Sequence, residues 1–149
     1  GRLGRVSEYI KNEEAFCFTY GDGVSNIDIS KLITFHKEHG KDATLTATYS
    51  PARFGALDIQ NQQILRFREK PKGDGSLING GFFVLSPNVL CRIPGDDCVW
   101  EDGPLKGLAS DGNLMAYTHD GFWQPMDTLR EMVYLQELWD KNKAPWKTW

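Results

Sequence analysis

The feature that most constrains the fold is a strand, turn, helix, strand pattern in the first third of the chain. Residues 15–20 form a continuous apolar run, which is typical of a strand covered on both faces. The run ends at 21–23 (Gly-Asp-Gly), and an amphipathic helix is predicted from Asp28 as its N-cap to Gly40 as its C′ residue. Residues 43–49 alternate threonine with apolar residues, as strands do. This order predicts a right-handed crossover in a mostly parallel sheet.

The rest of the chain predicts antiparallel additions to that sheet. The expected elements are a helix at 3–12, a hairpin of 54–59 and 64–68 that turns at Asn61-Gln62, strands at 78–85 and 114–118, a strand or loop end at 122–127, short helices at 87–93 and 104–109, and a helix at 128–141. The apolar residues of this last helix are expected to face the core. The sequence therefore predicts an α/β fold in a single domain, residues 1–149.

Composition excludes several classes of protein. Forty per cent of the residues are hydrophobic and the net charge is −3, so the chain is not disordered. It shows no basic run for a nucleic acid and no apolar stretch long enough for a membrane. The three cysteines lack metal or disulfide spacing, and a reducing, cytoplasmic compartment is expected. Cys17 is expected to be buried, and His36, His39 and His119 are expected at the surface.

Two aspartates are candidate metal ligands. Asp22 follows the first strand, and ligands of open α/β sheets bind beyond the carboxyl ends of strands. A carboxylate there suits a hard cation, whereas the alternative is ordinary Gly-Asp turn chemistry. Asp127 has an alternative role as the N-cap of the helix at 128–141. The two carboxylates could share one cation only if their strand ends are adjacent, which the sequence does not show.

Three further segments carry candidate substrate-binding residues. Glu69-Lys70 ends a strand, where a lysine is either a point charge for a phosphate or part of a solvated turn. The glycines of Asn79-Gly80-Gly81 weaken a strand unless something packs closely, and a sugar ring or a β-bulge would each account for them. Glu101 either bonds a sugar hydroxyl or is merely exposed.

Six segments stand in a characteristic order along the chain. They are 20–24 (Tyr-Gly-Asp-Gly-Val), 53–58 (Arg-Phe-Gly-Ala-Leu-Asp), 67–75 (Phe-Arg-Glu-Lys-Pro-Lys-Gly-Asp-Gly), 78–83 (Ile-Asn-Gly-Gly-Phe-Phe), 122–128 (Phe-Trp-Gln-Pro-Met-Asp-Thr) and 144–149 (Ala-Pro-Trp-Lys-Thr-Trp). Together they resemble the sugar-1-phosphate nucleotidylyltransferases, and within that family the glucose-1-phosphate cytidylyltransferase branch. The resemblance covers essentially the whole chain.

The resemblance implies a Rossmann-like, GT-A-like mixed sheet flanked by helices and incomplete at the N-terminus. It implies that Asp22 and Asp127 hold the catalytic Mg²⁺ and that Lys70 grips the phosphate of the sugar 1-phosphate. Glu69, Asn79, Gly80 and Glu101 are then sugar contacts, and Gly1 is the last trace of a glycine-rich segment that contacts the base. The implied partners are CTP, glucose 1-phosphate and CDP-glucose, for nucleotide-sugar and O-antigen polysaccharide synthesis.

One departure from the family pattern bears on activity. The family opens with a loop, Gly-Gly-x-Gly-Thr-Arg-Leu, and a following Lys-Pro element that hold the triphosphate, and neither is matched here. The chain is therefore expected to be the C-terminal portion of such a protein and inactive, or nearly so, by itself. The sequence is also compatible with a homo-oligomer, because the last helix and the tail with Trp146 and Trp149 could pack on their own domain or on another subunit.

Two other functions remain open. A non-catalytic module that binds a sugar phosphate or a nucleotide sugar would fit the missing loop. A metal-dependent glycosyltransferase is also an α/β protein that uses nucleotide sugars. That class places Asp-x-Asp after a strand, whereas this chain has Asp22-Gly23-Val24, which disfavours it.

Overall fold

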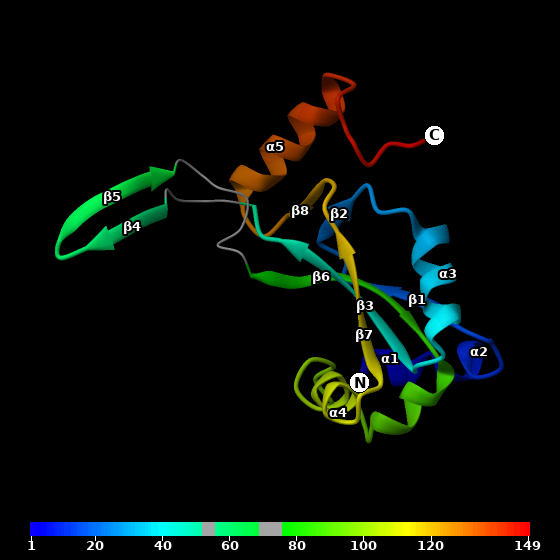
Figure 1. The fold of residues 1–149 in the computed structure, drawn as a ribbon. Helices are drawn as coiled ribbons and strands as arrows, with labels where there is room; N and C mark the ends of the chain where they lie inside the picture. Colours follow the sequence, from blue (N-terminus) through cyan, green and yellow to red (C-terminus); the bar gives the residue numbers. More distant parts are fainter. Residues whose placement is uncertain (52–55, 69–75) are drawn as a thin grey trace. The chain divides into compact units, whose positions relative to one another are not determined.

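The computed structural model describes residues 1–51, 56–68 and 76–149, with the backbone alone for 56–59 and 68. These residues form two compact units, which we call unit 1 (1–21, 28–46 and 81–118) and unit 2 (22–27, 47–80 and 119–149). Unit 1 holds α1 (Arg2–Arg5), α2 (Ser7–Ile10), β1 (Phe16–Thr19), α3 (Ile29–His39), most of β3 (Ala43–Tyr49) and of β6 (Leu77–Leu85), the 3₁₀ helix η1 (Pro87–Arg92), α4 (Pro104–Ser110) and nearly all of β7 (Leu114–His119). Unit 2 holds β2 (Gly23–Ser25), β4 (Ala56–Gln60), β5 (Gln63–Arg68), β8 (Trp123–Pro125) and α5 (Leu129–Asp140) (Figure 1).

The main sheet has four strands in the order β1-β6-β3-β7. β6 lies between β1 and β3 and pairs antiparallel with β1, from Phe16 opposite Leu85 to Thr19 opposite Phe82. The prediction that β1 is covered on both faces is wrong, because burial alternates along it and Cys17 is exposed. An apolar run alone does not distinguish a central strand from an edge strand with one covered face. The predicted mixed α/β class is confirmed.

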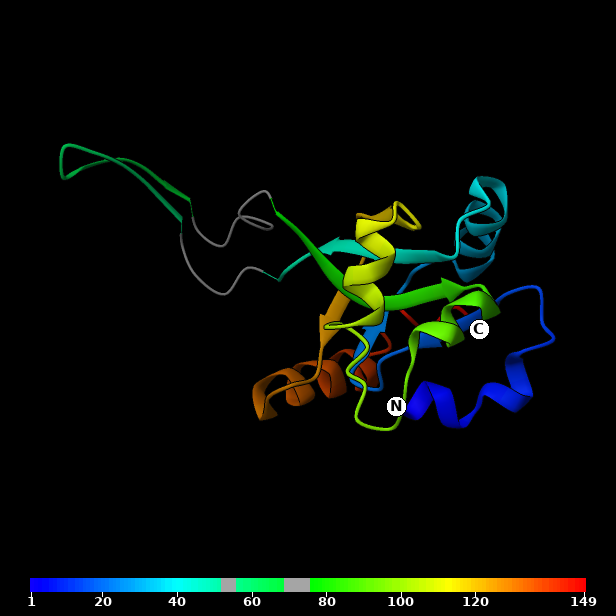
Figure 2. The same ribbon diagram turned by 90° about the horizontal axis from the view of Figure 1, so that it is seen from below.

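Local signals in the sequence set the ends of several elements. The Asp28 carboxylate accepts a hydrogen bond from the Lys31 N–H at 3.0 Å and caps α3, and Gly40 ends this helix with a φ of 64°. Asn61 and Gln62 both have positive φ, as a two-residue hairpin turn between β4 and β5 requires. The predicted helix at 3–12 is instead divided at Val6 into α1 and α2, the two short helices near the N label in Figure 2.

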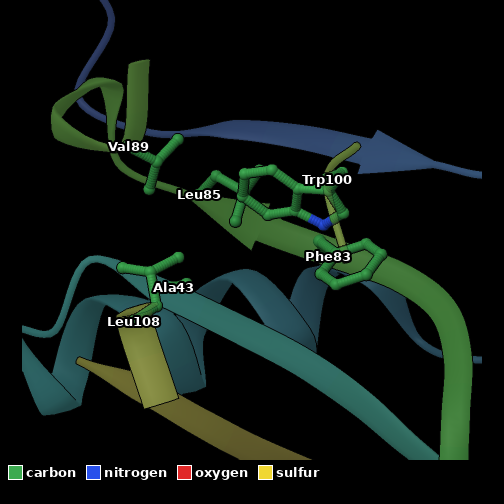
Figure 3. Close-up of a cluster of buried hydrophobic side chains, with 6 residues drawn as sticks. All are labelled: Ala43, Phe83, Leu85, Val89, Trp100 and Leu108. Atoms are coloured by element: carbon green, nitrogen blue, oxygen red, sulfur yellow. The ribbon is translucent and has the colours of Figure 1, made fainter. Parts of the chain in front are cut away.

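Apolar side chains of β6 and its neighbours form the core of unit 1. The buried cluster consists of Ala43, Phe83, Leu85, Val89, Trp100 and Leu108 (Figure 3). Phe18 and Trp100 meet edge to face, with ring centroids 5.8 Å apart, and Phe83 lies 5.4 Å from Phe18. Such aromatic contacts add to the burial of apolar area and hold β1 against β6.

The histidines of α3 are not surface residues, contrary to the sequence prediction. His36 is 5% exposed, and its Nδ1 lies 2.9 Å from the Thr44 hydroxyl, which also lies 2.7 Å from Nε2 of His39. Because His39 Nδ1 accepts from the Lys41 N–H, its proton is on Nε2, which donates to Thr44, and Thr44 in turn donates to His36. The spacing of these residues on a mostly polar helix gave no sign of this buried network. His119, also expected at the surface, is half-buried.

In unit 2, β2 pairs antiparallel with β8, and α5 lies beside this pair in both ribbon views (Figures 1 and 2). The prediction that the apolar residues of α5 face a core is largely wrong: Leu135 is buried, but Leu129 is 73% exposed and Val133 is 45% exposed. The tail packs on its own unit, where Trp146 stacks on Phe122 with centroids 5.4 Å apart. In the described residues, no helix combines the length and apolarity needed to span a membrane.

We predict that the histidine network makes unit 1 less stable in acid. Burial lowers the pKa of both His36 and His39 below 6.5, so the unfolded chain binds protons first as the pH falls. The free energy of unfolding should therefore drop between about pH 7.5 and about pH 5.5. Urea unfolding at the two pH values measures the drop. The variant His36→Gln/His39→Gln should lose less stability over this range, and an equal loss would contradict the prediction.

Candidate active site

The pairing of β2 with β8 brings the two candidate metal ligands to the same end of a ladder. Gly23 lies opposite Pro125, and the next residues outward are Asp22 and Met126. The Met126 N–H donates to the Asp22 carbonyl oxygen at 2.7 Å, which extends the ladder by one bond. Asp127 is the next residue along the chain after Met126. The strand ends whose adjacency the sequence could not show are therefore adjacent within unit 2.

Asp127 is not the N-cap of α5, so the alternative role that the sequence allowed for it is wrong. Thr128 is the N-cap: its hydroxyl accepts from the Glu131 N–H at 3.3 Å, and the Glu131 carboxylate accepts from the Thr128 N–H at 3.0 Å. The Glu131 carboxylate also accepts from the Asp127 N–H, so the backbone of Asp127 is fixed while its side chain stays exposed. Within the described residues, neither the Asp22 nor the Asp127 carboxylate has a hydrogen-bonding or ion-pair partner.

Each of these carboxylates is a donor of the kind that hard divalent cations bind. They are exposed oxygen donors on a fixed backbone, and Mg²⁺ is commonly bound through one or two carboxylates together with waters and substrate phosphates. Among residues 1–51, 56–68 and 76–149, no group of three or more His, Cys, Asp or Glu side chains forms a cage that would hold a metal without such additional ligands.

Separate substitutions of Asp127 and Thr128 test whether only Thr128 stabilises the helix. We predict that Thr128→Ala lowers the free energy of unfolding by about 1 kcal/mol, because a helix cap is lost. Asp127→Asn should change it by less than about 0.5 kcal/mol, as expected of an exposed side chain without a partner. Urea unfolding measures both values, and a larger loss for Asp127→Asn would restore a structural role for that carboxylate.

A third segment of the candidate site reaches the same ladder through Trp123. The indole Nε1–H of Trp123 donates to the carbonyl oxygen of Gly80 at 2.7 Å. Gly80 is buried and Asn79 is half-buried. The contact connects the predicted sugar-binding segment with β8 within unit 2. Sequence reasoning missed Trp123 because nothing in its local pattern indicates where the indole N–H points.

The protein's own packing requires a glycine at position 81. Its φ of 75° lies in the region that favours glycine, and a β-carbon there would lie 2.7 Å from Cδ2 of Tyr20. The Tyr20 ring packs edge to face on Phe83, with centroids 5.6 Å apart, and its hydroxyl donates to the Glu101 carboxylate. Glu101 is thus exposed, as one alternative held, but it also binds the Tyr20 hydroxyl.

The remaining predicted site residues stand as follows. Gly1 lies in unit 1 against the loop at 96–98, where its amino group donates to the Cys98 carbonyl oxygen. Glu69 and Lys70 lie outside the described residues, so their predicted roles stay predictions. Unit 2 also has an open cavity of about 470 Å³, lined by 48–51, 119–124 and Tyr134, which does not include Asp22, Asp127 or Asn79.

We predict that Gly81→Ala is more destabilising than the same change at another glycine with positive φ. Gly112 has a φ of 67° and open space around the β-carbon position, so Gly112→Ala reports the backbone cost alone. Gly81→Ala adds the clash with Tyr20, and the total should be about 1–3 kcal/mol. Thermal unfolding of both variants gives the difference. Equal losses would show that the tyrosine ring simply moves aside.

Comparison with known protein families decides the relationship. Residues 4–107 match the model of the family described as nucleotidyl transferase. The chain belongs to the nucleotidyl transferase family. Over all of its 149 residues it is 65% identical to the glucose-1-phosphate cytidylyltransferase of Salmonella typhi. It is 32% identical, over 97% of its length, to the mannose-1-phosphate guanylyltransferase catalytic subunit beta of Dictyostelium discoideum. The predicted resemblance is thus confirmed.

Solved structures agree on the fold of this nucleotidyl transferase chain. A crystal structure assigned to a glucose-1-phosphate thymidylyltransferase of Bacillus anthracis, in complex with sucrose, superimposes with a TM-score of 0.63 over 99% of the chain. At 18% sequence identity, this likeness concerns the fold alone. The chain spans 58% of the Salmonella relative and 60% of the Bacillus chain. Its predicted place as the C-terminal portion of such a protein stays a prediction.

Proposed function

We propose that this chain is the acceptor-side portion of a Mg²⁺-dependent glucose-1-phosphate cytidylyltransferase domain. The observation that supports this most is the β2–β8 ladder, which ends near two exposed carboxylates that have no hydrogen-bonding or ion-pair partner among the described residues. The base preference rests on identity, which is 65% to a cytidylyltransferase and 32% to a guanylyltransferase. We further propose a cytoplasmic setting in which CDP-glucose supplies polysaccharide synthesis, such as that of O-antigen.

The proposed reaction transfers a cytidylyl group from CTP to glucose 1-phosphate. An oxygen of the sugar phosphate attacks the α-phosphorus of CTP, a new P–O bond forms, and pyrophosphate leaves. No protein nucleophile is required, so catalysis consists of positioning and of stabilising charge on phosphate oxygens. Mg²⁺ held by Asp22 and Asp127 would neutralise developing charge on those oxygens.

The other residues of the chain have roles in binding the acceptor. Lys70 would hold the attacking phosphate as a point charge, and Glu69, Asn79, Gly80 and Glu101 would bind sugar hydroxyls. Glu101 is suited to this because one of its carboxylate oxygens is already held by the Tyr20 hydroxyl. Gly1 would contribute at the base. Hydrogen bonds of the Asp127 N–H and the Asp22 carbonyl oxygen hold the backbone at both residues and leave the carboxylate oxygens available.

Binding measured by NMR shift perturbation tests the proposal on this chain. CDP-glucose should bind in the presence of Mg²⁺, and Asp22→Asn or Asp127→Asn should abolish the magnesium dependence. Asp140→Asn, the same change at the end of α5, should not affect binding. Binding that is indifferent to magnesium and to both aspartates would favour the non-catalytic binding module. Absence of binding by a folded chain would contradict the assembled site.

Turnover distinguishes the chain alone from the longer protein that contains it. We predict no measurable CDP-glucose synthesis by residues 1–149 alone, because the triphosphate-binding loop is not among them. In the longer protein, Asp22→Asn and Asp127→Asn should each lower kcat by about 100-fold or more. Pyrophosphate release measures both. Robust synthesis by the chain alone would contradict its proposed incompleteness.

A further inference from the structure

We propose that Trp123 is a positioning residue for the acceptor sugar: it holds Asn79-Gly80 next to the Asp22 end of the β2–β8 ladder. This inference rests on the proposed function and adds a residue to it. Trp123 would not touch the reacting atoms. It would act through the backbone of the segment that binds the sugar.

The first observation is the contact itself. The Trp123 indole N–H is a single, directional donor, and it lies 2.7 Å from the Gly80 carbonyl oxygen. Gly80 is buried and Trp123 is half-buried, so this bond is partly shielded from bulk water. A carbonyl oxygen in such a place loses more when its donor is removed than an exposed one would.

The second observation explains the second glycine of the 21–23 motif. Ser25 pairs with Trp123 and Gly23 with Pro125, so Gly23 lies diagonally across the ladder from Trp123, on the same face. A β-carbon at Gly23 would lie 3.9 Å from the indole Nε1. Any side chain longer than that of alanine would therefore compete with the indole for this face. Glycine at this position leaves the indole free to reach along the ladder toward Gly80.

Together these contacts connect three segments that are far apart in the sequence. Asp22-Gly23 carries one carboxylate, Trp123 lies four residues before Asp127, and Asn79-Gly80 carries the proposed sugar contacts. The ladder fixes the first two relative to each other, and the indole N–H fixes the third. All three lie in unit 2. Trp123 thus aligns the sugar with the two metal ligands without contacting either substrate.

The test is steady-state kinetics of the longer protein with Trp123→Phe, which keeps an aromatic ring and removes the donor. We expect KM for glucose 1-phosphate to rise about tenfold, while KM for CTP and kcat change less than about twofold. Trp149→Phe is the matched control, because Trp149 is 81% exposed. In an Asn79→Ala background, Trp123→Phe should have a much smaller effect, since both changes act on one segment.

Three results would overturn the inference. The first is a KM for glucose 1-phosphate in Trp123→Phe equal to that in Trp149→Phe. The second is an equal rise in KM for CTP, and the third is that the effects of Trp123→Phe and Asn79→Ala on KM for glucose 1-phosphate are fully additive in free energy.

A second measurement needs no variant and does not depend on turnover. In ¹⁵N-labelled protein, the sequentially assigned indole signal of Trp123 should shift when glucose 1-phosphate is added, and that of Trp149 should not. If the protein makes no CDP-glucose but the Trp123 signal shifts, the proposed function fails and the role of Trp123 in holding a sugar phosphate stands. If CDP-glucose is made and the Trp123 signal does not move, the inference fails and the proposed function stands.

Discussion

The short pairing of β2 with β8 is the interaction on which the candidate site depends. Three residue pairs and one further hydrogen bond, from Met126 to Asp22, bring two distant parts of the chain together. Without this pairing, Asp22 would be an isolated turn residue and Asp127 an isolated residue before a helix. With it, the backbones of Asp22 and Asp127 come close to each other at one end of the ladder.

Glycine is needed at positions 23 and 81 for different physical reasons. Gly81 makes room for the Tyr20 ring, and its positive φ could be kept by few other residues. Gly23 leaves a face of the ladder open to the Trp123 indole, which in turn binds Gly80. What looked from the sequence like space for a sugar is in part space for aromatic side chains of the protein. The sugar would then meet a segment whose conformation those aromatics already determine.

Family membership and the geometry of unit 2 come from different parts of the chain. The nucleotidyl transferase match rests on residues 4–107, whereas Trp123, Asp127 and the cap of α5 lie beyond that range. The carboxylate pair therefore requires a part of the chain that the family match does not cover. The chain spans 58% of the length of the Salmonella protein.

The sequence by itself determined the local structure: the cap and end of α3, the turn of the β4–β5 hairpin and the order of the elements follow from residues close together in the chain. It also supplied Asp22 and Asp127 as candidates. The tertiary structure alone decided that their strand ends meet and that Thr128, not Asp127, caps α5. It also decided that His36 is buried and Cys17 exposed, the reverse of what the sequence predicted. These outcomes depend on which strand lies beside which and on what covers each face. Those are contacts between residues far apart in the sequence, and local patterns do not encode them.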